Sequence, residues 1–343
     1  MSRRYLLFVT KPYSFAVLEP LQACIQEHGF GEVAWFTASL AERYPVPGRV
    51  LTTTGEVEAY NPDAVLVPGN AVPHFWPGLK VQVFHGLDDE VQGFYRLAGL
   101  FDLYCTPGPV STRRFHVLAA THRYFLVEET GWPKLDPLAS SRDIAAARQE
   151  LGLNHEDPVV LYAPTFPPKY TSAPALWPAI RELTAGPYRW LIKFHPLMDA
   201  ALQQAYRDLA GDYLQVVDGL SILPYMQAAD LLVTDTSSVA YEFLLLNRPL
   251  VTYRATARLD KGLDISRPGE LAGALHRSLD QPAEFMAQRQ AYLNEVHPYT
   301  DGQSSRRVLE TVDRVLDQGL HMKLHRKPLN LVRKWKIRRL VGR

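Results

Sequence analysis

Cysteine is almost absent from this sequence, which has only Cys24 and Cys105 among its 343 residues. Two thiols cannot form a disulfide framework or a metal site with several thiolate ligands, so we expect a protein of a reducing compartment, the cytosol. Long hydrophobic runs are also lacking. The longest uncharged stretch, Ala64–Leu79, contains three prolines and is shorter than the roughly 20 apolar residues that a membrane-spanning helix needs. The apolar run after the basic start ends at Lys11-Pro12 without a cleavage site and is interpreted as a first strand.

Several catalytic signatures are missing as well. No glycine-rich phosphate loop follows an apolar run and no Gly-x-Ser-x-Gly sequence occurs, which argues against dinucleotide-dependent dehydrogenases, P-loop enzymes and the usual α/β-hydrolases. No histidine pair has the spacing of metal ligands, and Asp88-Asp89-Glu90 is the one acidic cluster near a predicted site. We therefore predict that no cofactor or metal is used, and that lysines, arginines and helix ends neutralise a bound anion.

What the sequence does contain is a strong separation of charge. Nine lysines and arginines and no acid lie between His321 and Arg343, whereas the other 320 residues carry 28 bases and 36 acids, a net charge of −8. A stable fold gains nothing from such sorting. The sequence therefore predicts a basic tail with its own anionic partner.

The length fits two domains, and 47% hydrophobic with 21% charged residues is typical of globular proteins. Short apolar runs alternate with amphipathic stretches, which predicts the α/β class with two doubly wound parallel sheets. The predicted strands are 5–10, 33–37, 64–67, 81–84, 103–106 and 124–127, then 159–163, 190–194, 214–217, 231–234 and 250–253; the predicted helices include 142–151, 175–183, 200–210, 239–246, 270–279, 282–296 and 303–320. We place the domains at residues 1–140 and 141–320, followed by the tail 321–343.

Ligands of open parallel sheets bind beyond the carboxyl ends of the strands, so the residues that follow each strand are site candidates. His85 leaves one predicted strand and is followed by Gly86. It is either a general base or a histidine that only holds a neighbouring loop. Lys193 and His195 alternate at the end of a strand in the second half and therefore share one face. His195 is either part of the site or the cap of a turn.

Hydroxyl groups gather at two further strand ends. Thr165 follows a rigid proline, and the run Thr234–Ser238 opens a predicted helix that includes Glu242. Helix amides and the hydroxyls of Thr236, Ser237 and Ser238 would form a phosphate site, although simple capping by Asp235 or a serine is the alternative. Further on, Arg306 or Arg307 could clamp a phosphate from the start of another helix, or could belong to an exposed basic turn.

Together these segments resemble the CDP-glycerol glycerophosphotransferase family of teichoic-acid-type polymer enzymes. The similar pieces occur in the family's order at 84–86, 130–136, 162–165, 193–196, 234–239 with 242–243, and 301–306. One departure is that members commonly continue His-Gly with Thr-Pro-Leu-Lys, where this chain has Leu87 and three acids.

The resemblance implies a GT-B-like fold and an enzyme that transfers glycerol phosphate, or a similar alcohol phosphate, from a CDP-activated donor to a hydroxyl. His85 would be the base in the first domain, with His195 opposite it across an interdomain cleft. The donor-phosphate site would consist of Thr165, Lys193, Thr236, Ser237, Ser238, Glu242 and Arg306. The acceptor would be a lipid-linked saccharide or polymer of the cell envelope. Three alternatives remain: a glycosyltransferase with a nucleotide sugar, a nucleotide-sugar epimerase, for which a basic tail has no use, and a non-catalytic polymer-binding protein.

For the tail we predict that anionic lipids, rather than nucleic acid, are the partner, because the rest of the chain is acidic and shows no recognition motif. On a helical projection its apolar residues do not gather on one side, so charge is expected to carry most of the binding. This predicts a cytosolic protein held peripherally on the inner face of the plasma membrane. The predicted contact residues are Arg333, Lys334, Trp335, Lys336, Arg338 and Arg339.

Overall fold

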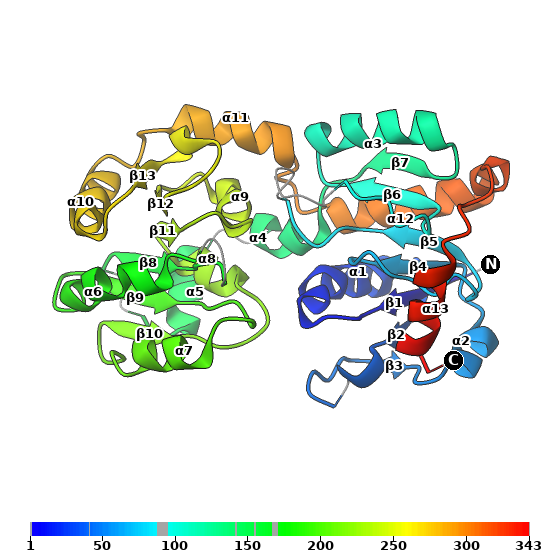
Figure 1. Cartoon of the computed structure of the whole chain (residues 1–343), viewed down its shortest axis with the longest axis horizontal. Coiled ribbons are helices and arrows are strands. Elements are labelled where there is room, and N and C mark those ends of the chain that lie inside the picture. The colour runs from blue at the N-terminus through cyan, green and yellow to red at the C-terminus, as the bar shows by residue number, and fades with distance from the viewer. Residues whose placement is uncertain are drawn as a thin grey trace. The chain divides into compact units, whose positions relative to one another are not determined.

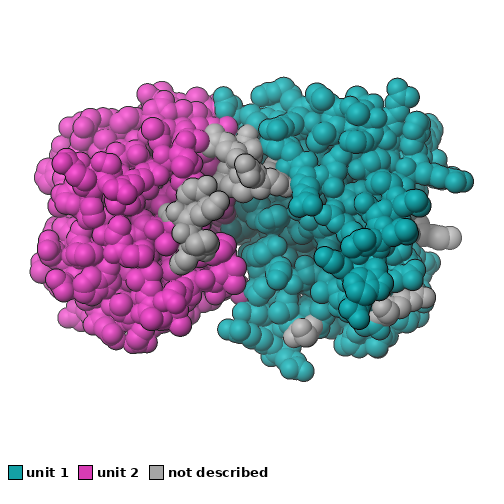
Figure 2. All heavy atoms as spheres, viewed as in Figure 1, with its two compact units in different colours: residues 1–140, 295–343 teal, residues 141–294 magenta. Residues whose placement is uncertain are grey.

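A computed structural model describes residues 2–40, 42–87, 95–140, 143–153, 156–166 and 171–342 of the chain. The chain divides into two compact units: unit 1 comprises residues 1–140 and 295–343, and unit 2 comprises residues 141–294 (Figure 2). Each unit contains a parallel sheet with helices on its faces (Figure 1). The predicted α/β class with two doubly wound sheets is confirmed. Among the described residues, no helix is long and apolar enough to cross a membrane.

Unit 1 has a seven-stranded sheet in the order β3-β2-β1-β4-β5-β6-β7. Its strands are β1 (Arg3–Phe8), β2 (Gly31–Phe36), β3 (Arg49–Val50), β4 (Ala64–Val67), β5 (Leu79–Gln82), β6 (Leu103–Thr106) and β7 (Leu126–Glu129). Its helices are α1 (Phe15–Glu27), α2 (Thr54–Tyr60), α3 (Pro109–His122), α4 (Asp136–Ser140), α12 (Ser304–Asp317) and α13 (Leu331–Leu340), with short 3-10 helices at Pro12–Ser14, Ala38–Leu40, Pro133–Leu135 and Leu320–Lys323.

Unit 2 has a six-stranded sheet in the order β10-β9-β8-β11-β12-β13. Its strands are β8 (Val159–Tyr162), β9 (Arg189–Ile192), β10 (Leu214–Val216), β11 (Leu231–Thr234), β12 (Leu250–Tyr253) and β13 (Leu263–Ile265). Its helices are α5 (Ile144–Glu150), α6 (Ala173–Leu183), α7 (Ala200–Arg207), α8 (Leu223–Ala228), α9 (Val239–Phe243), α10 (Leu271–Asp280) and most of α11 (Met286–Val296), with 3-10 helices at Leu244–Leu246, Leu259–Lys261 and Pro268–Glu270.

Every predicted strand overlaps a strand of the structure, because strands that are buried on both faces appear in the sequence as continuous apolar runs. The sequence missed β3 and β13, which lie at sheet edges. β3 has only two residues, one of them an arginine, and β13 carries an aspartate. Neither produces an apolar run.

The carboxyl-terminal segment is placed differently from the prediction. We expected the second domain to continue to residue 320, but residues 295–320 belong to unit 1. Helix α12 packs along α1, and its first amides are capped by a residue of the amino-terminal half. The N–H groups of Ser304 and Ser305 donate to the two carboxylate oxygens of Asp136 at 2.9 and 2.7 Å. This buried capping contact holds the returning chain on unit 1.

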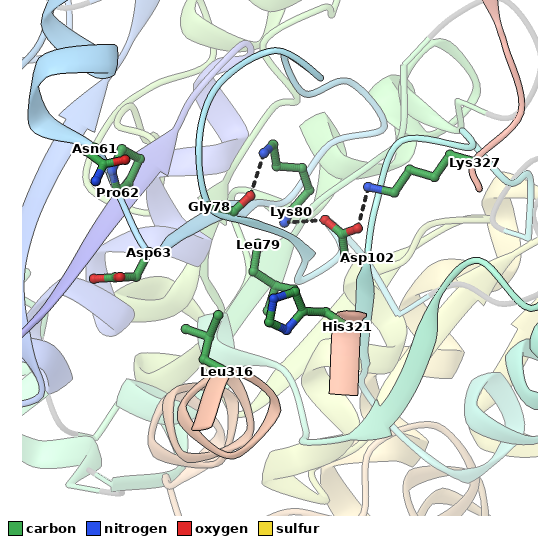
Figure 3. Close-up of a pocket in the computed structure, with 10 residues that line it drawn as sticks. All are labelled: Asn61, Pro62, Asp63, Gly78, Leu79, Lys80, Asp102, Leu316, His321 and Lys327. Atoms are coloured by element: carbon green, nitrogen blue, oxygen red, sulfur yellow. Dashed lines mark hydrogen bonds and ion pairs between the residues drawn. The ribbon is translucent and has the colours of Figure 1, made fainter. Parts of the chain in front are cut away.

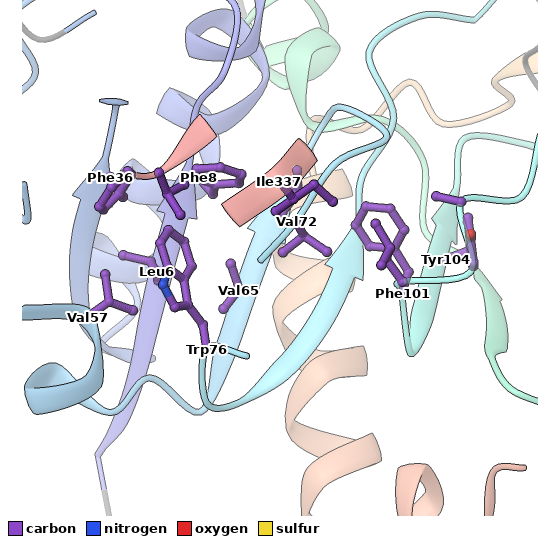
Figure 4. Packing of buried hydrophobic residues seen from close by; sticks show 14 of the residues in the cluster. Leu6, Phe8, Phe36, Val57, Val65, Val72, Trp76, Phe101, Tyr104 and Ile337 are labelled. Carbon is purple, nitrogen blue, oxygen red and sulfur yellow. The ribbon is translucent and has the colours of Figure 1, made fainter. Parts of the chain in front are cut away.

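The basic tail also packs on unit 1. The connection from β4 to β5 contains no helix, and α13 supplies the cover instead. Ile337 of α13 is 3% exposed and lies in the core cluster with Phe8, Val72 and Trp76 (Figure 4). Lys327, in the segment that leads to α13, forms an ion pair with Asp102. The segment that the sequence predicted to be a separate tail therefore packs on unit 1 and contributes Ile337 and Val341 to its core.

This packing predicts that replacing Ile337 by alanine lowers the free energy of unfolding by about 2–4 kcal/mol, because it removes buried methyl groups and leaves a cavity. Urea denaturation followed by tryptophan fluorescence measures the change. The control is Leu331→Ala in the same helix, where the side chain is 70% exposed and the cost should stay near 0.5 kcal/mol. Equal effects of the two substitutions would show that α13 does not pack as described.

Candidate functional sites at the carboxyl ends of the two sheets

The candidate site of unit 1 lies where the strand order reverses. β1 pairs with β2 on one side and with β4 on the other, and ligands of such sheets bind at this reversal. Segments that follow β1, β4 and β5 meet here. The ring of His85 lies 5.3 Å from that of Tyr13, and its Nδ1 is 3.2 Å from the carbonyl oxygen of Pro68. His85 is therefore at the edge where the sequence predicted a site.

The electronic state of His85 follows from that contact. A carbonyl oxygen only accepts, so Nδ1 carries the proton and Nε2 holds the lone pair of the neutral ring. The ring reaches solvent, yet burial by the surrounding protein atoms lowers its pKa, and the Pro68 hydrogen bond offsets this in part. The imidazole is therefore mainly neutral at pH 7 and presents a basic nitrogen.

Sequence reasoning missed three polar residues near the ends of β1, β4 and β5 in unit 1. These are Tyr13, Asn70 and Gln82, whose amide donates to Asn70 Oδ1 at 2.6 Å. Tyr13 and Asn70 do follow strands β1 and β4, so their position was a signal, but their residue types alone indicate no chemistry. Phe84, directly before His85, has a φ of +58°. A bulky residue in this region is strained and is more frequent at functional sites.

In unit 2 the strand order reverses between β8 and β11, and Asp235 joins the segments that follow them. One carboxylate oxygen of Asp235 accepts the backbone N–H of Thr165 at 2.9 Å. The other accepts the N–H and the hydroxyl of Ser172, both at 2.8 Å. The alternative in which Asp235 caps the following helix is wrong, because its oxygens are used to fix the loop after β8. Ser172 was not predicted.

His195 follows β9 and is held by two contacts. The N–H of Leu197 donates to its Nδ1 at 3.1 Å, and Phe166 stacks on its ring with centroids 4.3 Å apart. His195 thus does cap a turn. Because Nδ1 accepts, the proton of the neutral ring is on Nε2. Burial and the charge of Lys193 lower the pKa of His195, so the ring is mainly neutral and presents an N–H donor.

The hydroxyl run follows β11 in unit 2 as predicted. Thr236, Ser237 and Ser238 are half-buried, and within the described part of the chain Thr236 Oγ1 has no hydrogen-bond partner. Helix α9 behind them has only five residues, so hydroxyls and local amides, more than a long helix dipole, would attract an anion. Glu242 is buried in the interior of unit 2, and its backbone N–H donates to the carbonyl oxygen of Ser238 at 3.2 Å.

Arg306 belongs to a different unit from the other predicted donor-site residues. It lies on α12 in unit 1, whereas Thr165, Lys193, His195 and the hydroxyl run lie in unit 2. Its Nε donates to Glu310 at 2.8 Å on the same helix. The sequence assigned Arg306 to the second domain because α12 follows α11 in the chain, and the return of the chain to unit 1 was not visible in the pattern.

For metals, the described residues contain no cluster of three or more histidine, cysteine or acidic side chains that could hold an ion. The predicted acidic cluster Asp88-Asp89-Glu90 lies outside the described residues. Metal independence therefore stays a prediction.

A cavity of about 530 Å³ lies at the amino ends of strands β4 and β5 of the unit 1 sheet, away from the carboxyl ends (Figure 3). Its charged groups already have partners. Asp102 accepts the backbone N–H of Lys80 at 2.9 Å and pairs with Lys327. The buried ammonium of Lys80 donates to the carbonyl oxygens of Trp76, Pro77 and Gly78. These contacts brace the chain, and the cavity is distinct from the strand ends described above.

Lys80 provides a test of stability against pH. Burial lowers its pKa to about 8, against an ordinary value of 10.5, with Asp102 opposing the shift. Between these two pH values the unfolded chain binds the additional proton, so this group makes the folded state more stable as pH rises from 8 to 10. We expect a gain of about 1–3 kcal/mol in urea denaturation. The gain should be missing in Lys80→Met; an identical pH slope in both proteins would contradict this.

Comparison with known proteins adds to these observations. A family model described as CDP-glycerol:poly(glycerophosphate) glycerophosphotransferase matches residues 86–314. Teichoic acid glycerol-phosphate primase of Bacillus subtilis is 27% identical over 173 residues, which are 46% of this chain and 44% of that protein. Teichoic acid glycerol-phosphate transferase of Staphylococcus aureus is 26% identical over 249 residues, which are 64% and 62%. The chain thus matches between two fifths and two thirds of the length of these relatives.

Solved structures agree on the fold. A variant of the wall teichoic acid polymerase TagF, soaked with CDPG, superimposes with a TM-score of 0.68 at 18% identity, covering 92% of this chain and 89% of that chain. This similarity shows the GT-B-like architecture that the sequence predicted.

Proposed function

Because the chain belongs to the CDP-glycerol:poly(glycerophosphate) glycerophosphotransferase family, we propose that it transfers glycerol phosphate from CDP-glycerol to a hydroxyl group of a cell-envelope glycan or polymer. The observation that carries the proposal beyond family membership is that Nδ1 has opposite hydrogen-bond partners in two strand-end histidines: a carbonyl oxygen at His85 and an N–H at His195. His85 presents a lone pair at Nε2, and His195 presents an N–H at the same ring position. Transfer from a pyrophosphate needs a base for the attacking hydroxyl and a hydrogen-bond donor for the departing phosphate.

The reaction follows from these groups. Nε2 of His85 takes the proton of the acceptor hydroxyl as its oxygen attacks the phosphorus that carries glycerol. The bond from that phosphorus to the oxygen of the cytidine phosphate breaks, and CMP leaves. The N–H of His195, the ammonium of Lys193 and the hydroxyls of Thr165, Thr236, Ser237 and Ser238 would stabilise the charge that develops on the departing phosphate. Positioning and electrostatics supply the catalysis.

The other two predicted site residues receive different roles. Glu242 is buried, so we assign it to supporting the hydroxyl segment from within unit 2. Arg306 is on unit 1 and remains a candidate for contact with substrate phosphate from that unit.

A donor screen tests the proposed function. Purified enzyme, with membranes as the source of acceptor, receives radiolabelled CDP-glycerol, a UDP-sugar or a CMP-sugar, each with and without excess chelator. We expect label transfer from CDP-glycerol alone, unaffected by chelator. Transfer from a sugar donor would identify a glycosyltransferase, and binding without transfer from any donor would identify a polymer-binding protein. Loss of transfer on chelation, restored by magnesium, would overturn metal independence.

We further propose that the acceptor is lipid-linked and that α13 holds the enzyme on the inner leaflet. The helix has two different faces. Ile337 packs inward, whereas Leu331, Val332 and Trp335 are exposed together with Lys336 and Arg339. The other predicted contacts, Arg333, Lys334 and Arg338, are nearer to the body of unit 1: the first two are half-buried, and Arg338 lies over the ring of Phe75. Basic and apolar side chains on one face suit an anionic membrane surface.

Truncation of the tail cannot test this proposal, because it would uncover the unit 1 core. The test is Lys336→Gln with Arg339→Gln, in sedimentation with phosphatidylglycerol vesicles. At about 1 kcal/mol per base, we expect binding to weaken roughly tenfold or more. The matched control is Arg181→Gln with Arg267→Gln, two exposed bases of unit 2, which changes net charge equally and should leave binding unchanged. Equal loss in both variants, or in neither, would refute α13 as the anchor.

A further inference from the structure

We propose that Trp132 and His297 are positioning residues for His85: they hold the strained backbone that aims its imidazole. The inference rests on the proposed function in taking His85 as the base. Two hydrogen bonds within unit 1 carry it: one from Trp132 to Phe84, and one from Trp132 to His297.

The first contact supports the residue before His85. Phe84 is buried and has a φ of +58°, a conformation that is strained for a bulky residue and persists only where its surroundings fix it. The indole Nε1–H of Trp132 donates to the carbonyl oxygen of Phe84 at 3.3 Å. This carbonyl belongs to the peptide unit that joins Phe84 to His85. The hydrogen bond therefore acts directly on the orientation of the His85 backbone.

The second contact fixes Trp132. Its side chain is fully buried, and its backbone N–H donates to Nε2 of His297 at 3.0 Å. His297 belongs to the segment that returns from α11 to unit 1. Burial lowers the pKa of His297 to about 4, so the ring stays neutral, and Nε2 stays an acceptor, throughout the physiological pH range. A protonated ring could not accept this bond.

Close backbone approach keeps the returning segment in place. A Cβ atom at Gly108 would lie 2.4 Å from the carbonyl oxygen of Val296, and one at Gly131 would lie 2.5 Å from Ser304 Oγ. Neither position has room for a side chain. The segment from Val296 to Ser304 therefore packs closely against the residues that follow β6 and β7. This packing holds His297 where it accepts the backbone N–H of Trp132. Misplacement of a catalytic group by about 1 Å can cost a hundredfold in rate.

Two tryptophan substitutions separate positioning from stability. Trp132→Phe keeps a buried aromatic ring, although a smaller one, and removes the N–H that donates to the carbonyl oxygen of Phe84. Trp35→Phe on β2 is the matched control, because its indole is also fully buried in unit 1 and donates to Gln22 Oε1 at 3.1 Å. The control therefore has the same loss of ring volume. Both variants lose a similar buried hydrogen bond. We expect kcat to fall about tenfold or more in Trp132→Phe, with KM within twofold, and to be unchanged in Trp35→Phe.

His297 offers a rescue test. His297→Leu removes the acceptor of the Trp132 N–H, whereas His297→Gln places an amide oxygen close to the position of Nε2. We expect the leucine variant to lose at least tenfold in kcat and the glutamine variant to recover most of it. Equal activity of the two variants, at equal unfolding free energy, would overturn the role of His297.

A readout without transfer distinguishes this inference from the proposed function. Carbon-13 labelling of histidine, with His85 assigned by its substitution, gives the titration of the His85 ring by NMR. Because burial dominates the lowered pKa, a loosened ring should titrate at higher pH in Trp132→Phe but not in Trp35→Phe. An unchanged His85 titration in Trp132→Phe overturns the inference whether or not the enzyme transfers glycerol phosphate. If Trp132→Phe shifts the His85 titration but the wild-type protein transfers no glycerol phosphate, only the proposed function is rejected.

Discussion

Replacement of His85 by alanine or asparagine is expected to reduce transfer by about 10²–10⁴, the usual contribution of a positioned base. Asparagine is the more informative change. Its amide can replace Nδ1–H as the donor to the Pro68 carbonyl, but it has no basic nitrogen at the position of Nε2. The loss should therefore be similar in both variants and should fall on kcat, while the affinity for CDP-glycerol measured by calorimetry stays within about twofold.

The pH profile gives a second test of the same residue. Because the neutral ring acts as base, transfer should fall as pH drops and the ring becomes protonated. Burial lowers the pKa of His85, so this decline should be centred below pH 6.5 and should be absent from the residual activity of the variants. A variant that keeps more than half of the wild-type kcat, or a decline centred well above pH 6.5, would exclude His85 as the base.

The location of the candidate residues could be predicted because parallel sheets bring the carboxyl ends of neighbouring strands to one edge. His85, Thr165, His195 and Ser237 follow β5, β8, β9 and β11, as the apolar runs indicated. The function of Asp235 could not be predicted in this way. Its sequence position suits a helix cap, and only the approach of Thr165 and Ser172, more than sixty residues away, reveals that it joins two loops.

The carboxyl-terminal segment shows a second limit. The apolar residues of α13 form no single stripe because they serve two surfaces: Ile337 enters the core, and Trp335 is exposed. A helical projection of the sequence does not separate the core-facing residue from the exposed ones, so it indicates only a basic tail. The placement of Arg306 in the second domain was wrong for a related reason, since nothing local in α12 indicates that its first amides are capped by Asp136. Contacts between residues far apart in the sequence determine both the packing of α13 and the placement of α12 in unit 1.

The second large effect is expected in donor binding by unit 2. His195→Ala removes an N–H that we assign to a donor phosphate, and Ser237→Ala with Ser238→Ala removes two hydroxyls. A hydrogen bond to a charged group contributes roughly 1.5–3 kcal/mol, so each variant should bind CDP-glycerol about 10-fold to 100-fold more weakly in calorimetry. His195→Gln keeps an N–H donor near Nε2 and should retain most of the affinity.

The control for this series is His276→Ala, an exposed histidine of α10 in the same unit, which should bind the donor as the wild type does. Calorimetry with CMP alone locates the effect: if His195 and the serines contact the departing nucleotide phosphate, CMP affinity falls in the same variants. If CMP binding is preserved while CDP-glycerol binding is lost, these side chains contact the phosphate that carries glycerol instead. Unchanged affinity for both ligands in His195→Ala and in the double serine variant would place the nucleotide site away from the carboxyl ends of β9 and β11.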